Sequence, residues 1–298
     1  VEAGLAGGPE TMPDSRLLEA AADLLRDESL DYAMVADMLM LPSENYLAQL
    51  AARDGGADVD TIHAARDIVR AAVGQANEAL FLATYERLAS NAPYAPDAQQ
   101  IAARALRNVC LSYLVAADDR YLELAETQFH DATNMTDRYA GLRELAFYGD
   151  TARQNAALDK FYADWRHEAL VVNQWLQVQA AIPDASALER VQGLLRHEEF
   201  DMRNPNKVRA VVGVFAGQNP VNFHRADGEG YRFLGDIVTQ LNGSNPQIAA
   251  RLLGPLTKWR SYRGRAELMQ AELKRLAALP DLSPDVFEVV SKSLVQNS

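Results

Sequence analysis

The sequence predicts an all-α protein, and three observations support this class. Ala, Leu, Glu, Arg and Gln dominate long stretches of the 298 residues, and these residue types lose little side-chain freedom in a helix. Apolar residues recur three or four positions apart, whereas the sustained alternation of Val, Ile and Thr that marks strands is missing. Helix start signals follow one another at short intervals, so we expect about fifteen helices of roughly 8–20 residues each.

Residues that can cap a helix N-terminus precede the apolar-periodic segments in the first two thirds of the chain. Their side-chain oxygens can accept hydrogen bonds from the free N–H groups of the first helical turn. We expect helices to begin at Asp14 or Ser15, Ser43, Asp58, Asp97, Asn134 and Asp184. The helix after Asp58 should pass through Val73, and Leu88 is the farthest end that its periodicity allows.

The final third starts its helices with a repeated device, in which a capping residue stands directly before proline. Proline is tolerated at the first helical position because its missing N–H would be unpaired there in any case. The pairs are Asn204-Pro205, Asn219-Pro220, Asn245-Pro246 and Ser283-Pro284. Each residue before a proline is therefore expected to cap the helix that follows it.

Many short helices need neighbours to bury their apolar faces, so we expect antiparallel helix pairs stacked on one another. No strict sequence period is present, and an irregular superhelical stack of the ARM or HEAT kind fits better than a consensus repeat. Residues 1–13 are Gly-rich and lack an initiator methionine, and we interpret them as a linker. Residues 14–298 form one helical domain in this interpretation.

Composition and charge argue against several classes of partner. The formal net charge is −12, which disfavours nucleic acid, because phosphate contacts need a basic face. The longest apolar stretches, such as 210–216, are far shorter than the ~20 residues that span a bilayer. The single cysteine, Cys110, stands between Val109 and Leu111, which predicts a buried thiol, no internal disulfide and a cytoplasmic location.

The chain lacks the motifs of common catalytic centres. A thermolysin-like zinc site needs two histidines four positions apart, with a glutamate beside the first. His167 and His197 are each followed by a glutamate, but Val171 and Asp201 stand where the second histidine is required. No Gly-rich phosphate loop and no Gly-x-Ser-x-Gly elbow are present. The sequence therefore predicts neither a catalytic residue nor a metal site in this chain.

Several short strings match one known family, in the same order, from about residue 14 to the C-terminus. They are 104–111 (RALRNVCL), 128–130, 134–137, 193–195, 204–209, 215–220 (FAGQNP), 223–224, 227–231, 245–247 and 251–252. Through these strings the chain resembles the C-terminal domain of bacterial aminopeptidase N, the alanyl aminopeptidases of the gluzincin class of zinc metallopeptidases.

The resemblance implies that the chain is part of an enzyme that removes N-terminal amino acids from peptides. In that family the zinc ion and the catalytic base belong to an earlier thermolysin-like domain with an HExxH motif. Neither that motif nor the family's amine-binding Gly-Ala-Met-Glu-Asn string occurs here. The family's C-terminal domain is a non-catalytic helical superhelix that caps the active-site chamber and restricts entry to peptides. Its implied partners are the catalytic domain of the same polypeptide and peptide substrates.

The resemblance also yields three candidates for substrate contacts in such a chamber: Arg209, Gln247 and Arg251. Arg209 lies near the start of the helix opened by Asn204-Pro205, and Gln247 and Arg251 share a helix face because they are four positions apart. A peptide held by its amine end presents a carboxylate to the far wall, and a guanidinium pairs with a carboxylate through two hydrogen bonds. The alternative for both arginines is a structural ion pair between helices.

Two other functions stay open at this point. A freestanding helical-repeat scaffold would bind a partner protein on its concave face. An independent hydrolytic enzyme would use clustered carboxylates such as Glu198, Glu199 and Asp201, although clustered acids are more often a solvated helix face. Separated from a catalytic domain, the chain should also expose the apolar surface that packs against that domain.

Overall fold

A computed structural model describes residues 13–90 and 92–295. The chain divides into two compact units: the first comprises Val1–Ser43 and Thr61–Phe161, and the second comprises Glu44–Asp60 and Tyr162–Ser298. The expected linker, residues 1–13, lies outside the described ranges except for Pro13. Its interpretation as a linker stays a prediction.

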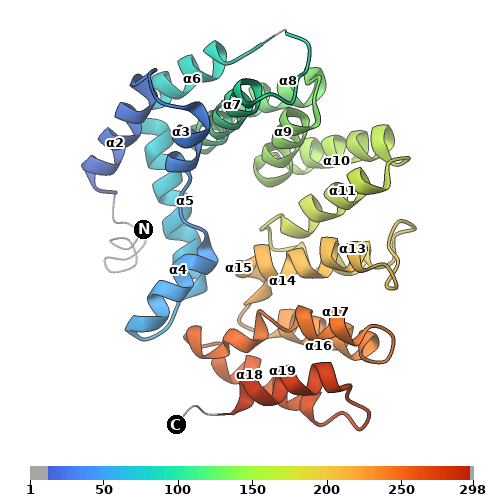
Figure 1. The fold of residues 1–298 in the computed structure, drawn as a ribbon. Coiled ribbons are helices and arrows are strands. Elements are labelled where there is room, and N and C mark those ends of the chain that lie inside the picture. The colour runs from blue at the N-terminus through green and yellow to red at the C-terminus, as the bar shows by residue number, and fades with distance from the viewer. Residues whose placement is uncertain (1–12, 91, 296–298) are drawn as a thin grey trace. The chain divides into compact units, whose positions relative to one another are not determined.

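The first unit consists of helices that pack in pairs along the sequence (blue to green in Figure 1, apart from α4). It contains α2 (Ser15–Arg26), α3 (Tyr32–Leu39), most of α5 (Val59–Ala76), α6 (Glu78–Arg87), α7 (Ala98–Ala117), the 3-10 turn η2 (Asp119–Tyr121), α8 (Leu122–Asp131), α9 (Met135–Tyr148) and most of α10 (Thr151–Trp165). The pair α8 and α9 approaches closely at Gly141, where an added Cβ would lie 2.7 Å from the carbonyl oxygen of Ala125. Glycine at this position therefore permits the close packing of the two helices.

The second unit continues the pairwise packing from α11 to α19 (yellow to red in Figure 1). It contains α4 (Glu44–Ala51), η1 (Ala52–Asp54), α11 (Ala169–Ala181), α12 (Ala187–Leu194), α13 (Pro205–Val208), η3 (Arg209–Gly213), α14 (Val214–Gln218), α15 (Pro220–Phe223), α16 (Glu229–Asn242), α17 (Pro246–Leu252), η4 (Leu256–Ser261), α18 (Ala266–Ala277) and α19 (Pro284–Leu294). Within this unit α11 packs against α12, α16 against α17, and α18 against α19.

The prediction of an all-α protein is confirmed. In the ranges that the structure describes, the one β-type contact is an isolated bridge between Ala57 and Tyr262. None of the described helices combines the length and the apolar character that a bilayer-spanning segment requires.

Most of the predicted capping residues take that role. A side-chain oxygen accepts a hydrogen bond from a backbone N–H of the first turn at Asp14, Asp97, Asn134, Asn204, Asn245 and Ser283. Two further helices, α4 and α5, begin directly after Ser43 and Asp58, as predicted. The local cap rule thus locates most helix starts in both units.

The long helix predicted after Asp58 does not reach Leu88 as one helix. It is interrupted at Asn77, which leaves the helical conformation with φ −120° and ψ 20° and separates α5 from α6. The buried Asn77 amide donates hydrogen bonds to the carbonyl oxygens of Leu18 (3.1 Å) and Val73 (3.2 Å). Because Leu18 belongs to α2, the break depends on a tertiary contact that the apolar periodicity does not report.

Two predicted caps have other roles. α12 does not begin directly after Asp184, whose carboxylate instead accepts hydrogen bonds from the N–H and the hydroxyl of Ser186. Asn219 does precede α15, but its side chain makes no capping bond. Its buried amide donates to the carbonyl oxygens of Ala180 (3.1 Å) and Ile182 (2.8 Å). Asn219 therefore ties the start of α15 to the end of α11.

Candidate functional site

The predicted residue Arg209 opens a π-helical turn. α13 begins after its cap Asn204 and leads directly into the π turn η3, in which the N–H of Val214 donates to the carbonyl oxygen of Arg209. Such turns are rare and occur frequently at functional sites. The residues between Arg209 and Gly213 are fully buried, whereas the Arg209 side chain is exposed.

α17 presents the other two predicted residues on one exposed face. Asn245 caps this helix by accepting a hydrogen bond from the N–H of Ile248 at 3.3 Å. Gln247 and Arg251 follow four positions apart, and both side chains are exposed. Within the described part of the chain, the Arg251 guanidinium has no hydrogen-bond or ion-pair partner. Its five N–H donors therefore face solvent.

Arg209 and the C-terminal end of α17 lie on neighbouring turns. A Cβ added to Gly213 would lie 3.7 Å from the Cβ of Arg209 and 3.9 Å from a methyl carbon of Leu252. The side chain of Leu252, which directly follows Arg251, therefore reaches the turn that begins at Arg209. Gln247 is placed one helical turn before Arg251 on the same face. The contact of these three residues with a substrate stays a prediction.

The local bonding of Arg209 leaves its charge unpaired. Its Nη2 donates to the Oδ1 of Asn206 at 2.5 Å, which orients the guanidinium without neutralising it. Among the described residues, neither Arg209 nor Arg251 forms the ion pair between helices that was the structural alternative. The surface at these two turns therefore carries two positive charges that are available to an anionic group.

The clustered carboxylates near position 200 make structural contacts. The Tyr162 hydroxyl lies within hydrogen-bond distance of Glu198 (3.2 Å) and Glu199 (3.3 Å). Glu199 also accepts from the buried ammonium of Lys207 at 3.5 Å, and Asp201 pairs with a neighbouring arginine. Burial and the two carboxylates raise the pKa of Tyr162 to about 12. These contacts fix α13 just before Arg209.

The histidines do not gather into a metal site. Among the residues that the structure describes, no three His, Cys, Asp or Glu side chains are grouped so that they could hold a metal ion. His224 stacks on Tyr262 with ring centroids 3.9 Å apart, and its Nδ1 lies 2.9 Å from the Tyr231 hydroxyl. Burial, followed by the charges of Arg265 and Lys258, lowers the pKa of His224 to about 3. The ring is therefore a neutral core residue of the second unit.

Cys110 is a buried free thiol, as the sequence predicts. Burial raises the pKa of this thiol to about 12. Because the thiolate is the nucleophilic form, Cys110 is not suited to covalent catalysis.

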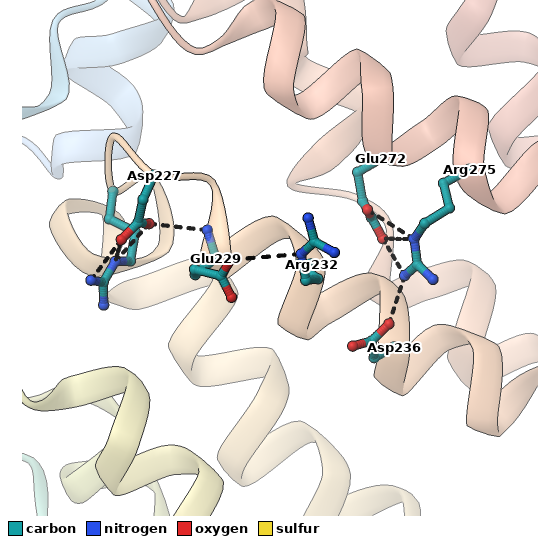
Figure 2. A network of polar contacts seen from close by, with 7 residues as sticks. Asp227, Glu229, Arg232, Asp236, Glu272 and Arg275 are labelled. Atoms are coloured by element: carbon teal, nitrogen blue, oxygen red, sulfur yellow. Dashed lines mark hydrogen bonds and ion pairs between the residues drawn. The ribbon is translucent and has the colours of Figure 1, made fainter.

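A second charged surface follows α16 and α18 (Figure 2). Arg232 lies 3.6 Å from Glu229 on α16, and Asp236 pairs with Arg275 of α18 at 2.8 Å. Arg275 also donates three hydrogen bonds of 2.6–3.0 Å to the buried carboxylate of Glu272. Sequence reasoning missed this network, because its charges come from helices that are distant in the sequence.

Sequence reasoning also missed the π turn. The apolar run 210–216 shows no periodicity, so it contains no signal of how the helix winds there. The position of Arg209 beside α17 depends on this turn and could not be read from residue spacing.

Comparison with known families gives a match along nearly the whole chain. A family model described as "Domain of unknown function (DUF3458_C) ARM repeats" matches residues 2–295. Aminopeptidase N of Caulobacter vibrioides is 38% identical over 292 residues, which cover 97% of this chain and 33% of the relative. Aminopeptidase N of Escherichia coli is 36% identical over 291 residues, with 97% of this chain and 33% of the relative covered.

Among solved structures, a crystal structure of Legionella pneumophila aminopeptidase A in complex with aspartic acid is similar to this fold. The TM-score is 0.86 at 30% sequence identity, and the match covers 97% of this chain and 35% of that chain. The chain thus spans about a third of the length of the curated relatives it matches, and this is their C-terminal third.

Proposed function

The chain belongs to the DUF3458_C family of ARM-repeat domains, and from this premise we propose that it is the non-catalytic helical C-terminal part of a zinc-dependent aminopeptidase. The observation that carries this proposal is the match of 97% of the chain to a third of aminopeptidase N from two bacteria. In this function the chain caps the active-site chamber, restricts entry to peptides and contacts the substrate. It works in the cytoplasm, a reducing compartment that suits a free buried thiol.

The zinc ion and the catalytic base belong to another part of the polypeptide in this proposal. The described residues of this chain supply no cluster of metal ligands. The isolated chain is therefore expected to release no p-nitroaniline from alanine p-nitroanilide, with or without added zinc. Chelator-sensitive hydrolysis by the purified chain would contradict the proposal.

Arg209, Gln247 and Arg251 supply the substrate contacts. All three side chains are exposed, and the two arginines lie on neighbouring turns of η3 and α17. A peptide held by its amine in the catalytic part presents its C-terminal carboxylate to this surface, where a guanidinium can donate two hydrogen bonds. The Gln247 amide can donate to or accept from a peptide backbone group.

The test combines this chain with the catalytic part of a relative. The Caulobacter vibrioides enzyme, purified without its own matching third, is mixed with this chain, and hydrolysis of tetra-alanine is compared with hydrolysis of tetra-alanine amide. We expect added chain to restore activity. Arg251→Ala should raise the KM for the free acid about ten-fold, the size of one lost charge-assisted hydrogen bond, and leave the KM for the amide unchanged.

Arg203→Ala is the matched control for this experiment. Arg203 is another exposed arginine of the second unit, but it is already paired with Asp201, so its loss should leave both KM values unchanged. An equal effect of Arg251→Ala on acid and amide would refute the carboxylate contact. If this chain and the catalytic part do not pack together even when they are fused in a single polypeptide, the better explanation is a freestanding helical-repeat scaffold that binds another protein.

The catalytic part packs against α3 in this proposal. The inner side of α3 is buried in the first unit through Val35 and Leu39, whereas Met34 and Met38 on its outer side are 44% and 59% exposed. A helix at a protein surface ordinarily carries a polar outer face. Methionine side chains are flexible and adapt to partner surfaces, so this outer face suits an interface with the remaining two thirds of the enzyme.

Methionine oxidation tests this interface. In the active mixture, hydrogen peroxide should convert Met34 and Met38 to sulfoxides more slowly than in the chain alone, as measured by peptide mass spectrometry. Met202, in the second unit, serves as the internal control with an unchanged rate. Equal oxidation rates of Met34 and Met38 in both samples would place the interface elsewhere.

A further inference from the structure

A groove of about 320 Å³ lies between α12 and α16 in the second unit. One wall is a single face of α16 from Glu229 to Gln240, and the other wall consists of Gln192, Leu195 and Arg196 at the end of α12. None of the three predicted substrate-contact residues lines this groove. Its volume is at the lower end of the range for small-molecule sites, which is about 300–1,000 Å³, so the groove suits a short ligand.

Three of the nine residues that line the groove are apolar. Phe233 and Ile237 are four positions apart on α16 and are 8% and 2% exposed, and Leu195, directly after α12, also lines the groove. Two amide side chains, Gln192 and Gln240, also line it. A ligand that fits this lining combines an apolar group with polar backbone groups.

Two arginines and two carboxylates line the groove, and one of these arginines, Arg196, has no ion-pair partner among the described residues. The two carboxylates already face guanidinium groups: Glu229 lies 3.6 Å from Arg232, and Asp236 is bonded to Arg275 outside the groove at 2.8 Å (Figure 2). Arg196 is exposed and, in the part of the chain that the structure describes, its guanidinium has no side-chain or backbone partner. The complementary ligand group is therefore an anion.

We propose that this groove binds the C-terminal carboxylate of a short apolar peptide. Arg196 donates to the carboxylate, the terminal apolar side chain lies on Phe233 and Ile237, and the amide of Gln192 or Gln240 pairs with the peptide backbone. A singly charged carboxylate fits better than a doubly charged phosphate, because Glu229 and Asp236 border the site and would repel the additional charge. The site is separate from the proposed chamber surface and does not depend on an aminopeptidase activity.

The test uses the 298-residue chain itself. Ligand-observed NMR titration compares N-acetyl-Leu-Leu, which has a free carboxylate, with N-acetyl-Leu-Leu amide. We expect the acid to bind and the amide to bind at least five-fold more weakly. Arg196→Gln should weaken binding of the acid about ten-fold, the effect of one lost charge-assisted hydrogen bond. Because Arg196 is exposed and has no partner in the described ranges, the variant should unfold at the same temperature as the unchanged chain.

Two further variants separate this groove from other arginine surfaces. Arg203→Gln removes an exposed arginine that pairs with Asp201 and should not change the affinity. Arg251→Gln removes a guanidinium of the proposed chamber surface that does not line the groove, and its effect shows which of the two surfaces holds the peptide. If Arg251→Gln rather than Arg196→Gln abolishes binding, the peptide occupies the proposed chamber surface and the groove inference is wrong. Equal binding of acid and amide, or displacement of the acid by equimolar inorganic phosphate, would also overturn it.

Discussion

Gly235 lies where α18 approaches α16, and a methyl group at this position should destabilise the second unit. A Cβ on Gly235 would lie 1.6 Å from Oε1 of Glu272 and 2.8 Å from Nη2 of Arg275, well inside van der Waals contact. Glu272 is only 8% exposed and is held by three hydrogen bonds from Arg275. In a Gly235→Ala variant the Glu272 carboxylate, which Figure 2 shows bonded to Arg275, therefore has to leave its buried position.

Three contributions set the magnitude of this effect. Loss of the Glu272–Arg275 contact costs about 1 kcal/mol, a discounted value because the Arg275 side chain is 40% exposed. Overpacking between the two helices costs about 2 kcal/mol. Alanine returns about 1 kcal/mol through its higher helix propensity. The net loss of about 2 kcal/mol should lower the unfolding temperature by roughly 4–8 °C.

The assay is thermal unfolding followed by circular dichroism, with Gly193→Ala as the matched control. Gly193 also lies inside a helix, but an added Cβ there meets no atom within 4 Å, so this variant should gain up to about 1 kcal/mol. In a Glu272→Ala variant the carboxylate that would clash with the new methyl group is absent. Adding Gly235→Ala to this variant should then leave the unfolding temperature unchanged or raise it. If Gly235→Ala behaves like Gly193→Ala, or if its penalty persists without Glu272, the reasoning is refuted.

Three further predictions concern buried polar groups. The pKa of His224 is about 3 in the folded chain, against an ordinary 6.5. Its neutral ring therefore contributes fully to the free energy of unfolding above pH 6.5. As the pH falls from 6.5 towards 3, the free energy of unfolding decreases by about 1.4 kcal/mol per pH unit. His224→Phe should therefore flatten the pH dependence of the urea midpoint between pH 6.5 and 4, and an unchanged slope would contradict this. Cys110, with its pKa raised to about 12, should resist a disulfide-exchange thiol reagent at pH 8 in the folded chain and react once urea unfolds it; rapid labelling of the folded chain would show that the thiol is accessible. Asn219→Ala leaves two buried carbonyl groups unpaired and should cost about 2–3 kcal/mol, whereas Asn245→Ala removes only a cap and should cost about 1 kcal/mol; equal losses in chemical denaturation would argue against these distinct roles.

The asparagine–proline pairs illustrate how much of the fold can be predicted from the sequence. Asn204 and Asn245 cap their helices as predicted, because a cap needs only the first turn that follows it. Asn219 stands in the same local pattern, yet it bonds to the end of α11. Asn77 likewise breaks a periodic helix to reach α2. Capping residues in the sequence therefore predict most helix starts. The exceptions arise where a buried asparagine amide bonds to a residue that is distant in the sequence.

Part of the candidate site can also be predicted from the sequence, and part cannot. Exposure of Gln247 and Arg251 on one face follows from their spacing after the cap Asn245. The position of Arg209 near α17 does not, because it requires both the π turn and the close approach of Leu252 to Gly213. The groove between α12 and α16 was equally hidden, since its two walls are separate segments of the sequence.

The π turn also changes the angular phase of the helix that contains it. Over four residues an α-helix drifts by about 40° around its axis, whereas a wider i→i+5 turn drifts in the opposite sense. Arg209 and Gly213 span the wide turn, and Gly217 follows one α-helical turn later. The backward drift of the wide turn and the forward drift of the α-helical turn offset each other, so the three residues lie on one side of the helix. These three positions are not buried, while those between them are. A single-residue deletion inside the turn would convert its i→i+5 winding to i→i+4 winding and largely keep the angular position of Arg209, whereas the same deletion in a regular α-helix would rotate the residues before it by about 100°.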